Sequence, residues 1–408
     1  MINLKKYIPE GSRDILFEEC SIKNNIENIL RDTYVKVGYE EVNSPTMEFY
    51  DVYNLENQPI SQEKMYKLFD NTGRILVLRP DMTTPIARIA ATKAKAKNYP
   101  LKLSYKGNIY RMNKALDGKI SEITQSGIEV LGISSLRADA EVLITAIKAI
   151  LNTGLTDFKI EIGQVEFFKS IISEVKLNKE DSEKLRNLIE SKNFSKVEEF
   201  VDKNSNLIEE DSREILTNMP KLFGGREIIE KARKLTKNSK AVEALKTVED
   251  LYDIVSKAGF SEYLLIDLGM VQHINYYTGL IFRGYAHGVG DALLSGGRYD
   301  KLIEQFGRDM PATGLAINVD NLMLALDDSL RKKLYSKEKY LVFASDNNIE
   351  KAYEALSDFN SKGIKAEVSL FNNLEDTKKY CVKNKIDKLF DADKWKIIEI
   401  RGINYGEK

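Results

Sequence analysis

The 408-residue sequence predicts an α+β fold, in which an antiparallel sheet is flanked by helices, interrupted by a helical insertion and followed by a small C-terminal α/β domain. Three observations support this prediction. Strand-like segments occur on both sides of residues 166–260. That block is rich in Lys, Glu, Asn and Leu and follows the helical period. Residues 339–408 then alternate strand and helix patterns after a charged, linker-like segment at 331–338.

Residues 1–165 are expected to form the first part of the core. Ile22, Ile26 and Leu30 recur at helical spacing, and alternating apolar residues mark the strands. A turn near Asn71-Thr72-Gly73 predicts a hairpin. The expected elements are a helix at 17–37, the hairpin at 65–79, a helix at 83–95, strands at 101–111 and 120–131, a helix at 137–152 and a strand at 158–165.

The second part of the core is expected at residues 261–330, after the helical insertion. Strand signals return there at 263–270, at 278–285 and in a Gly-rich stretch at 288–297, and a helix is expected at 319–330. In the C-terminal domain the expected elements are strands at 339–344, 364–370 and 396–400, with a helix after residue 344 through Phe359 and another at 374–384.

Composition excludes several classes of function. The 61 basic and 62 acidic side chains nearly cancel, which disfavours strong electrostatic attraction to nucleic acid. Cys20 and Cys381 have no disulfide or metal spacing, and His273 and His287 are too few for a multi-histidine zinc site. No apolar run is long enough for a membrane span, and the N-terminus lacks the apolar core of a signal peptide. We therefore expect a cytoplasmic protein without metal or other cofactor.

Two stretches of the predicted core concentrate polar groups near strand ends. Asp81 and Thr83 follow a strand in Leu78–Thr83, and together they offer two acceptors for an ammonium group. The same residues are typical of a helix N-cap, which remains an open alternative. On the strand at 120–131, Gln125, Gly127 and Glu129 share one face, and Gly127 is expected to leave space there for a small ligand. Arg111 on the neighbouring strand suits a carboxylate. A solvent-facing polar edge is the alternative there.

Two further stretches combine aromatic residues with glycines. The pair Tyr276-Tyr277 opens a strand and offers ring walls and phenol groups to an imidazole, although such pairs also pack in cores. Ser295-Gly296-Gly297-Arg298-Tyr299-Asp300 lets the backbone approach a ligand or another strand closely, and a tight turn is the simpler interpretation.

Taken together, the four stretches resemble the catalytic domain of histidyl-tRNA synthetases, a class II synthetase fold, from Pro9-Glu10-Gly11 to about Leu326. Residues 38–45 are similar to the class II dimer-interface motif, which implies a homodimer. The resemblance carries histidine-contacting roles to seven positions. The ammonium side would comprise Asp81, Thr83, Gln125 and Glu129, the imidazole side Tyr276 and Tyr277, and the carboxylate partner Arg111.

The same resemblance fails at the positions that handle ATP. The synthetases have an arginine where this chain has Gln272, a glutamate–arginine pair at Asp320-Asn321, glutamate at Asn113 and arginine at Ser121. Adenylate formation needs positive charge on the phosphates, and each lost preorganised charge typically costs ~10²–10³ in rate. The chain is therefore expected to have no catalytic residues and no synthetase activity.

Retained histidine contacts without activation chemistry resemble the histidyl-tRNA synthetase-like regulatory subunit family of ATP phosphoribosyltransferase. Arg283-Gly284-Tyr285 is also similar to that family. The resemblance implies a short-form ATP phosphoribosyltransferase catalytic subunit as partner, L-histidine as ligand, and a role in the first step of histidine biosynthesis and its feedback. An unusual histidyl-tRNA synthetase, or a synthetase paralogue that binds tRNA, remains the alternative, with tRNA disfavoured by the charge balance.

Overall fold

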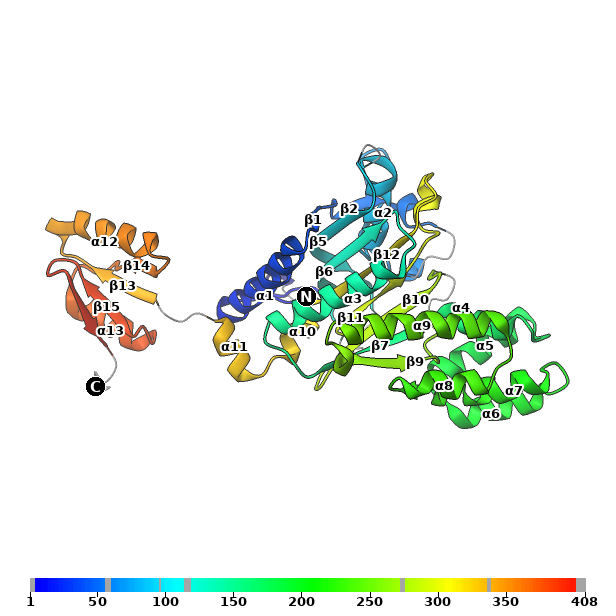
Figure 1. The fold of residues 1–408 in the computed structure, drawn as a ribbon. Helices are drawn as coiled ribbons and strands as arrows, with labels where there is room; N and C mark the ends of the chain where they lie inside the picture. The colour runs from blue at the N-terminus through cyan, green and yellow to red at the C-terminus, as the bar shows by residue number, and fades with distance from the viewer. Residues whose placement is uncertain are drawn as a thin grey trace. The chain divides into compact units, whose positions relative to one another are not determined.

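The chain folds into two compact units, Met1–Leu334 and Tyr335–Lys408 (Figure 1). The structure is a computed structural model that describes residues 4–55, 60–94, 97–113, 119–271, 276–335 and 339–400. The predicted α+β organisation is confirmed: a mainly antiparallel sheet carries flanking helices, a run of helices interrupts its strands, and a small α/β unit follows.

A large sheet forms the centre of the first unit, and its neighbouring strands are antiparallel except for the pairs β1–β5 and β7–β9, which are parallel. In spatial order the strands within the described residues are β1 (Glu40–Glu41), β5 (Leu101–Tyr110), β6 (Glu122–Leu131), β12 (Ala312–Asn318), β11 (Leu294–Arg298), β10 (Leu280–Ala286), β7 (Phe158–Gln164), β9 (Leu264–Asp267) and β8 (Phe223–Gly224).

Helices cover both faces of this sheet. One face is packed by α1 (Phe17–Lys36), α3 (Leu136–Asn152) and α10 (Val319–Ala325), which contact β5, β12 and β6 (Figure 1). The other face holds α2 (Thr83–Thr92), whose buried Ile86 belongs to a core cluster with Tyr105. The side chains of β5 and β6 alternate between these two environments, as a pleated sheet requires.

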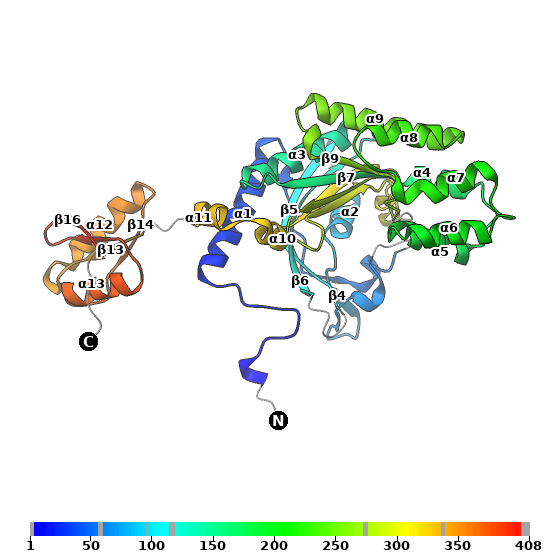
Figure 2. The same cartoon turned by 90° about the horizontal axis from the view of Figure 1, so that it is seen from below.

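The block between β7 and β9 is mainly helical. Its long helix α9 contacts α3, α4 and β7, while Figure 2 shows α4 to α7 gathered beyond one end of β7. The predicted boundaries at residues 166 and 260 stay a prediction. The helices are α4 (Val165–Ile172), α5 (Lys179–Glu190), α6 (Phe194–Lys203), α7 (Glu210–Asn218), α8 (Glu227–Lys234) and α9 (Ser239–Lys257).

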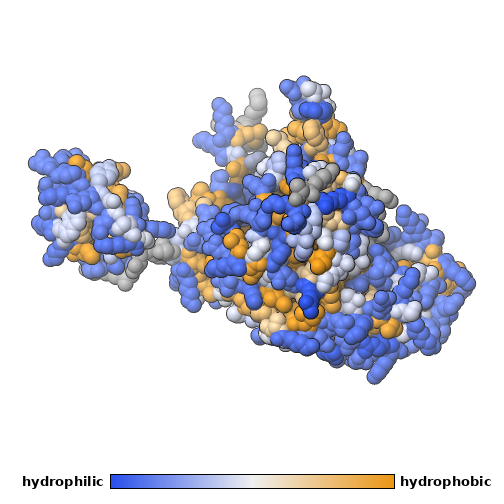
Figure 3. All heavy atoms as spheres, turned by 45° about the horizontal axis from the view of Figure 1, so that its top comes forward, coloured by the Kyte–Doolittle hydropathy of each residue, from blue (hydrophilic) through white to orange (hydrophobic). Residues whose placement is uncertain are grey.

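A separate three-stranded sheet contains the predicted hairpin. It pairs β2 (Met47–Phe49) with β4 (Ile75–Leu78) and β4 with β3 (Lys67–Phe69). Phe49 and Leu68 both pair with Leu76, so these three side chains share one face of the sheet. Phe49 and Leu68 are exposed, in keeping with the apolar residues that interrupt the hydrophilic surface in Figure 3.

Two features of the prediction are wrong at the end of the first unit. Strand β12 was not predicted, because it is buried along most of its length and its sequence ATGLAIN lacks the alternation of apolar and polar residues. The helix expected at 319–330 is two helices, α10 and α11 (Asp328–Leu334), so the expected linker begins inside α11. Leu326 is extended and ends α10, and the Asp327 carboxylate accepts a hydrogen bond from the Leu330 amide to begin α11.

The C-terminal unit has its own sheet, in which β13 pairs in parallel with β14 and β15, and β15 pairs in antiparallel with β16. The short strand β15 was not predicted. The elements are β13 (Lys339–Phe343), α12 (Ile349–Ser361), β14 (Lys365–Val368), α13 (Leu374–Lys383), β15 (Lys388–Asp391) and β16 (Lys396–Glu399). Short 3-10 turns elsewhere lie at Leu4–Lys6, Tyr50–Val52, Gln62–Lys64, Met219–Lys221, Ser261–Tyr263, Ile303–Phe306 and Asp346–Asn348.

Within the ranges given above, no helix combines the length and the apolar character that crossing a membrane requires.

Glycines allow β11 and β12 to approach closely at the centre of the large sheet. A Cβ atom on Gly296 would lie 2.2 Å from the carbonyl oxygen of Gly314 and 2.4 Å from the Cβ of Leu315. Backbone atoms in a paired strand have little freedom to move away. The Gly-Gly pair is therefore required by strand packing, and its turn-like interpretation is wrong at Gly296, which lies inside β11.

We expect Gly296→Ala to lower the free energy of unfolding by about 1–3 kcal/mol, because the added methyl group overpacks the β11–β12 contact. Urea denaturation followed by circular dichroism measures this. Gly290→Ala is the matched control, since a Cβ there meets nothing within 4 Å. Equal unfolding midpoints for the two variants would contradict the packing argument.

Candidate functional site

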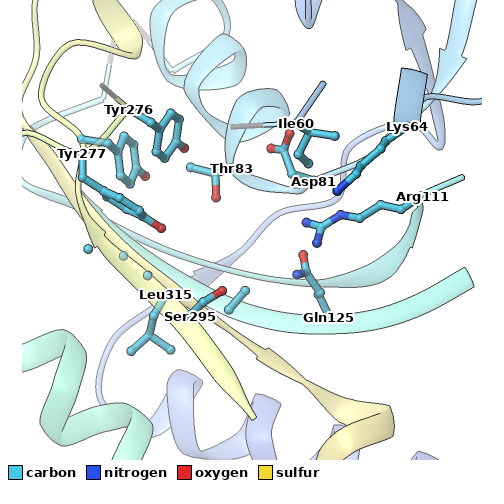
Figure 4. Close-up of a pocket in the computed structure, with 15 residues that line it drawn as sticks. Ile60, Lys64, Asp81, Thr83, Arg111, Gln125, Tyr276, Tyr277, Ser295 and Leu315 are labelled. Carbon is cyan, nitrogen blue, oxygen red and sulfur yellow. The ribbon is translucent and has the colours of Figure 1, made fainter. Parts of the chain in front are cut away.

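A cavity of about 250 Å³ lies on the α2 side of the large sheet. Its volume is below the roughly 300–1,000 Å³ typical of sites for drug-sized ligands, which suits a ligand of amino-acid size. Segments far apart in the sequence meet around it, and Figure 4 shows their polar ends directed toward a common space. The lining residues are Ile60, Lys64, Asp81, Thr83, Arg111, Gln125, Tyr276, Tyr277, Ser295, Gly296, Gly297, Tyr299, Gly314, Leu315 and Ala316.

The turn from β4 into α2 places Asp81 and Thr83. The two carboxylate oxygens of Asp81 accept hydrogen bonds from the amide and the hydroxyl of Thr84, at 2.7 and 3.1 Å. Asp81 therefore accepts hydrogen bonds from the first turn of α2 and also lines the cavity, while its role toward an ammonium group stays a prediction. Burial raises the pKa of the Asp81 carboxyl, because it disfavours the charged form.

Arg111 and Gln125 come from the ends of β5 and β6. The Nε of Arg111 donates to the carbonyl oxygen of Pro80 at 2.9 Å, which fixes the guanidinium, and burial lowers its pKa. Figure 4 shows the guanidinium beside Gln125 and Asp81, with the ammonium of Lys64 approaching from the same side. One end of the cavity thus combines two cations, one acid and one amide.

Glu129 lies behind the cavity wall and is only 1% exposed. Its carboxylate accepts hydrogen bonds from the hydroxyls of Tyr299 at 2.5 Å, Thr83 at 3.2 Å and Tyr105 at 3.4 Å. Thr83 and Tyr299 line the cavity, whereas Glu129 does not. Burial raises the pKa of the Glu129 carboxyl to about 8, because the hydrogen bonds do not fully compensate for lost solvation.

Gly127 does not leave space for a ligand, contrary to its expected role between Gln125 and Glu129. A Cβ on Gly127 would lie 2.4 Å from the ring and hydroxyl of Tyr105, which is itself buried. The space therefore belongs to the Tyr105 ring, which fills the core beneath the cavity. Direct contact of Glu129 with a ligand stays a prediction.

The paired tyrosines form an aromatic wall. The rings of Tyr276 and Tyr277 meet edge to face at 5.0 Å, and Tyr276 stacks on Tyr299 at 6.0 Å. Gly297 makes this possible, since a Cβ there would lie 2.9 Å from the Tyr277 ring. Burial raises the pKa of the Tyr277 phenol, so it stays protonated and can both donate and accept a hydrogen bond.

Six of the seven predicted histidine-contacting residues thus line one cavity, and Glu129 supports two of its lining hydroxyls. Sequence reasoning missed Lys64 and gave no binding role to Ser295 or Tyr299. Lys64 sits in an ordinary charged stretch and carried no motif. It lies in the 3-10 turn Gln62–Lys64 before β3, and only the tertiary structure brings its side chain to the cavity. Across the residues that the structure describes, no group of His, Cys, Asp and Glu could hold a metal ion.

The positions at which a synthetase carries ATP-handling charges form internal hydrogen bonds instead. The side-chain amide of Asn321 donates a hydrogen bond to the carbonyl oxygen of Ala292 at 2.8 Å, and the side-chain amide of Asn113 donates one to the carbonyl oxygen of Ile120 at 3.0 Å. Ser121 is buried, and its backbone amide donates a hydrogen bond to the carbonyl oxygen of Gly11. Gln272 lies outside the described residues.

Asp320 is also engaged in internal contacts. Its carboxylate accepts a hydrogen bond from Lys23 at 2.7 Å and another from the amide of Thr124 at 2.8 Å. The acid therefore joins α10 to α1 and β6.

The fold and the site define a class II synthetase-like protein. The histidyl-tRNA synthetase family model matches residues 11–322, which confirms the resemblance carried by the four motifs. A solved histidyl-tRNA synthetase from Nostoc shares the fold, with a TM-score of 0.79 at 19% identity over 97% of this chain and 96% of that chain.

Two comparisons at higher sequence identity show to which family within this class the chain belongs. An ATP phosphoribosyltransferase regulatory subunit of Clostridium acetobutylicum is 76% identical over 408 residues, 100% of each chain. A solved Bacillus halodurans structure, described as an ATP phosphoribosyltransferase regulatory subunit/histidyl-tRNA synthetase, is 33% identical with a TM-score of 0.84, covering 95% of this chain and 97% of that chain. The chain belongs to the ATP phosphoribosyltransferase regulatory subunit family.

We expect the Glu129 carboxyl to make stability fall with rising pH. Its pKa is about 8 when folded against an ordinary 4.5, so the folded protein binds more protons than the unfolded chain between these values. In Glu129→Gln this loss disappears. Urea unfolding from pH 4.5 to 9 should show wild type weakening relative to the variant up to about pH 8, then a constant difference. Parallel profiles would mean that Glu129 is ionised when folded.

Proposed function

We propose that this chain is the regulatory subunit of ATP phosphoribosyltransferase, that it supports the first step of histidine biosynthesis, and that it binds L-histidine in the cavity. The observation that carries the proposal is the distribution of charge around the cavity. Lys64 and Arg111 suit a carboxylate, Asp81 suits an ammonium group, and Tyr277 suits an imidazole nitrogen (Figure 4).

The proposal assigns no synthetase chemistry to the chain. Attack on the α-phosphate of ATP requires preorganised positive charge, and Asn321, Ser121 and Asn113 are uncharged and engaged in internal hydrogen bonds. A site that holds an amino acid without activating it supports a sensor. Histidine would then shift the activity of a complex only if it binds one conformational state better than another.

The catalytic partner in this proposal is the short-form ATP phosphoribosyltransferase subunit, and the complex acts in the cytoplasm, where nucleotide and amino-acid biosynthetic substrates are held. The family name itself implies an enzyme to be regulated. A tRNA partner has no support from the balanced charge of the chain.

A homodimer through the region of residues 38–45 is also part of the proposal. The three-stranded sheet directly after this region leaves Met47, Phe49 and Leu68 between 41% and 53% exposed. Apolar side chains gathered on one sheet face are typical of surfaces that are covered in an assembly.

We expect addition of this chain to a short-form catalytic subunit to produce ATP phosphoribosyltransferase activity that L-histidine inhibits. The measurement is formation of phosphoribosyl-ATP from ATP and phosphoribosyl pyrophosphate, with and without histidine. The catalytic subunit alone is the control for activity that does not depend on this chain.

Two results would contradict this proposal. Activity that is unchanged by the chain would remove the regulatory role. Histidine-dependent exchange of pyrophosphate into ATP by the chain alone would instead favour the synthetase alternative, and recovery of tRNA without a phosphoribosyltransferase would favour a tRNA-binding paralogue.

We expect Arg111→Met to weaken binding of L-histidine by about 10–100-fold, since charged hydrogen bonds contribute about 1.5–3 kcal/mol. Calorimetry with histidine and with histidinol, which lacks the carboxylate, locates the effect. Wild type should prefer histidine, and the variant should lose that preference. Arg137→Met, at an exposed arginine on α3, is the matched control. Equal preference in wild type would place the carboxylate elsewhere.

A further inference from the structure

The segment that contains Tyr276 and Tyr277, the aromatic wall of the cavity, is contacted on both of its sides by the helical block. Tyr276 and Tyr277 lie between Val271, which follows β9, and Arg283 on β10. Helix α5 of the helical block reaches both flanks of this segment through its last turn. The contact joins two parts of the chain that are 81 and 93 residues apart in sequence.

Glu190 makes both flanking contacts with a single carboxylate. One oxygen accepts a hydrogen bond from the amide of Val271 at 2.7 Å. The other accepts from the guanidinium of Arg283 at 3.1 Å. Because the two oxygens of one rigid group bind the two sides of the tyrosine segment, a shift of α5 changes the separation of those sides.

Neighbouring side chains of the helical block strengthen the same attachment. Lys192, just beyond α5, pairs with Asp267 at the end of β9 with a distance of 2.7 Å. Arg186 on α5 donates to the carbonyl oxygen of Val271 at 3.4 Å, and Lys169 on α4 donates to that of Tyr277 at 3.5 Å. The helical block therefore touches the backbone of a residue that lines the cavity.

The Glu190–Arg283 pair is shielded from solvent, with side chains 19% and 21% exposed. Shielded pairs are costly to break by removing one partner, because the other charge is left uncompensated. Arg283 belongs to the Arg283-Gly284-Tyr285 motif, to which neither the cavity nor the proposed partner gave a role.

We infer that Glu190 is a positioning residue that couples histidine binding in the cavity to the state of helix α5. This inference rests on the proposed function, since histidine is the ligand whose contacts with Tyr276 and Tyr277 would be coupled. Linkage makes the effect reciprocal: histidine in the cavity stabilises α5, and anything that holds α5 in place raises the affinity for histidine by the same factor.

Calorimetry with L-histidine tests the coupling in the full chain. Glu190→Ala removes both contacts and should raise the dissociation constant roughly tenfold, within the range of allosteric couplings. Glu190→Gln keeps an acceptor for Val271 and should raise it less. Glu180→Ala is the matched control, an exposed glutamate at the other end of α5. An unchanged dissociation constant in both Glu190 variants would overturn the inference.

Hydrogen exchange separates coupling from a purely structural role. Histidine should slow amide exchange in Lys179–Glu190 of wild type and have no such effect in Glu190→Ala. A destabilised variant in which histidine still protects α5 would overturn the coupling.

If wild type binds no histidine, the proposed function fails on its own. The contact of Glu190 with Val271 can still be tested without ligand, since the Val271 amide should exchange faster in Glu190→Ala than in wild type, whereas Glu190→Gln, which keeps the acceptor, should exchange more slowly than Glu190→Ala. Equal rates would overturn it.

Discussion

The buried carboxyl group of Glu129 connects the parts of the molecule on which the cavity depends. It accepts hydrogen bonds from the hydroxyl of Thr83, at the start of α2, and from the hydroxyl of Tyr299. It lies on β6 opposite Gly314 of β12. A Cβ on Gly314 would lie only 1.5 Å from its oxygen, so the neighbouring strand has a glycine where the acid needs room. An isolated buried carboxylate is costly, and a proton held to about pH 8 resolves that cost. The start of α2, strand β6 and Tyr299 beside the aromatic wall are thus held together by one carboxyl group that stays protonated up to about pH 8.

Much of the fold follows from periodicity, because long amphipathic helices and alternating strands carry their own burial pattern. Helix α3, for example, was predicted at 137–152 and spans Leu136–Asn152. The failures share a cause. Strands β12 and β15 are buried along most of their length, so neither shows an alternating pattern, and both are defined by the partners on either side. Parallel pairing of β7 with β9 joins strands separated by the helical block, which no local signal reports.

The cavity was predictable where residue chemistry and a strand end coincide, as at Asp81 and Arg111. It was not predictable where tertiary structure alone sets the direction of a side chain, as at Lys64 in the 3-10 turn before β3. Gly127 shows a third case: the glycine signalled a close approach correctly, but the approaching group is the Tyr105 ring. The family resemblance supplied the ligand, since the residues alone also allowed a helix cap at Asp81 and Thr83 and core packing at Tyr276 and Tyr277.

The double engagement of Asp81 by Thr84 has a consequence for recognition. Both carboxylate oxygens are already held by a buried neighbour on the first turn of α2, so the acid presents its remaining lone pairs in one orientation before any ligand arrives. A ligand that uses them loses little entropy in ordering its partner. Thr84 does not line the cavity, yet it fixes the orientation in which Asp81 presents its carboxylate there. A substitution at Thr84 would therefore change the cavity as well as the first turn of α2.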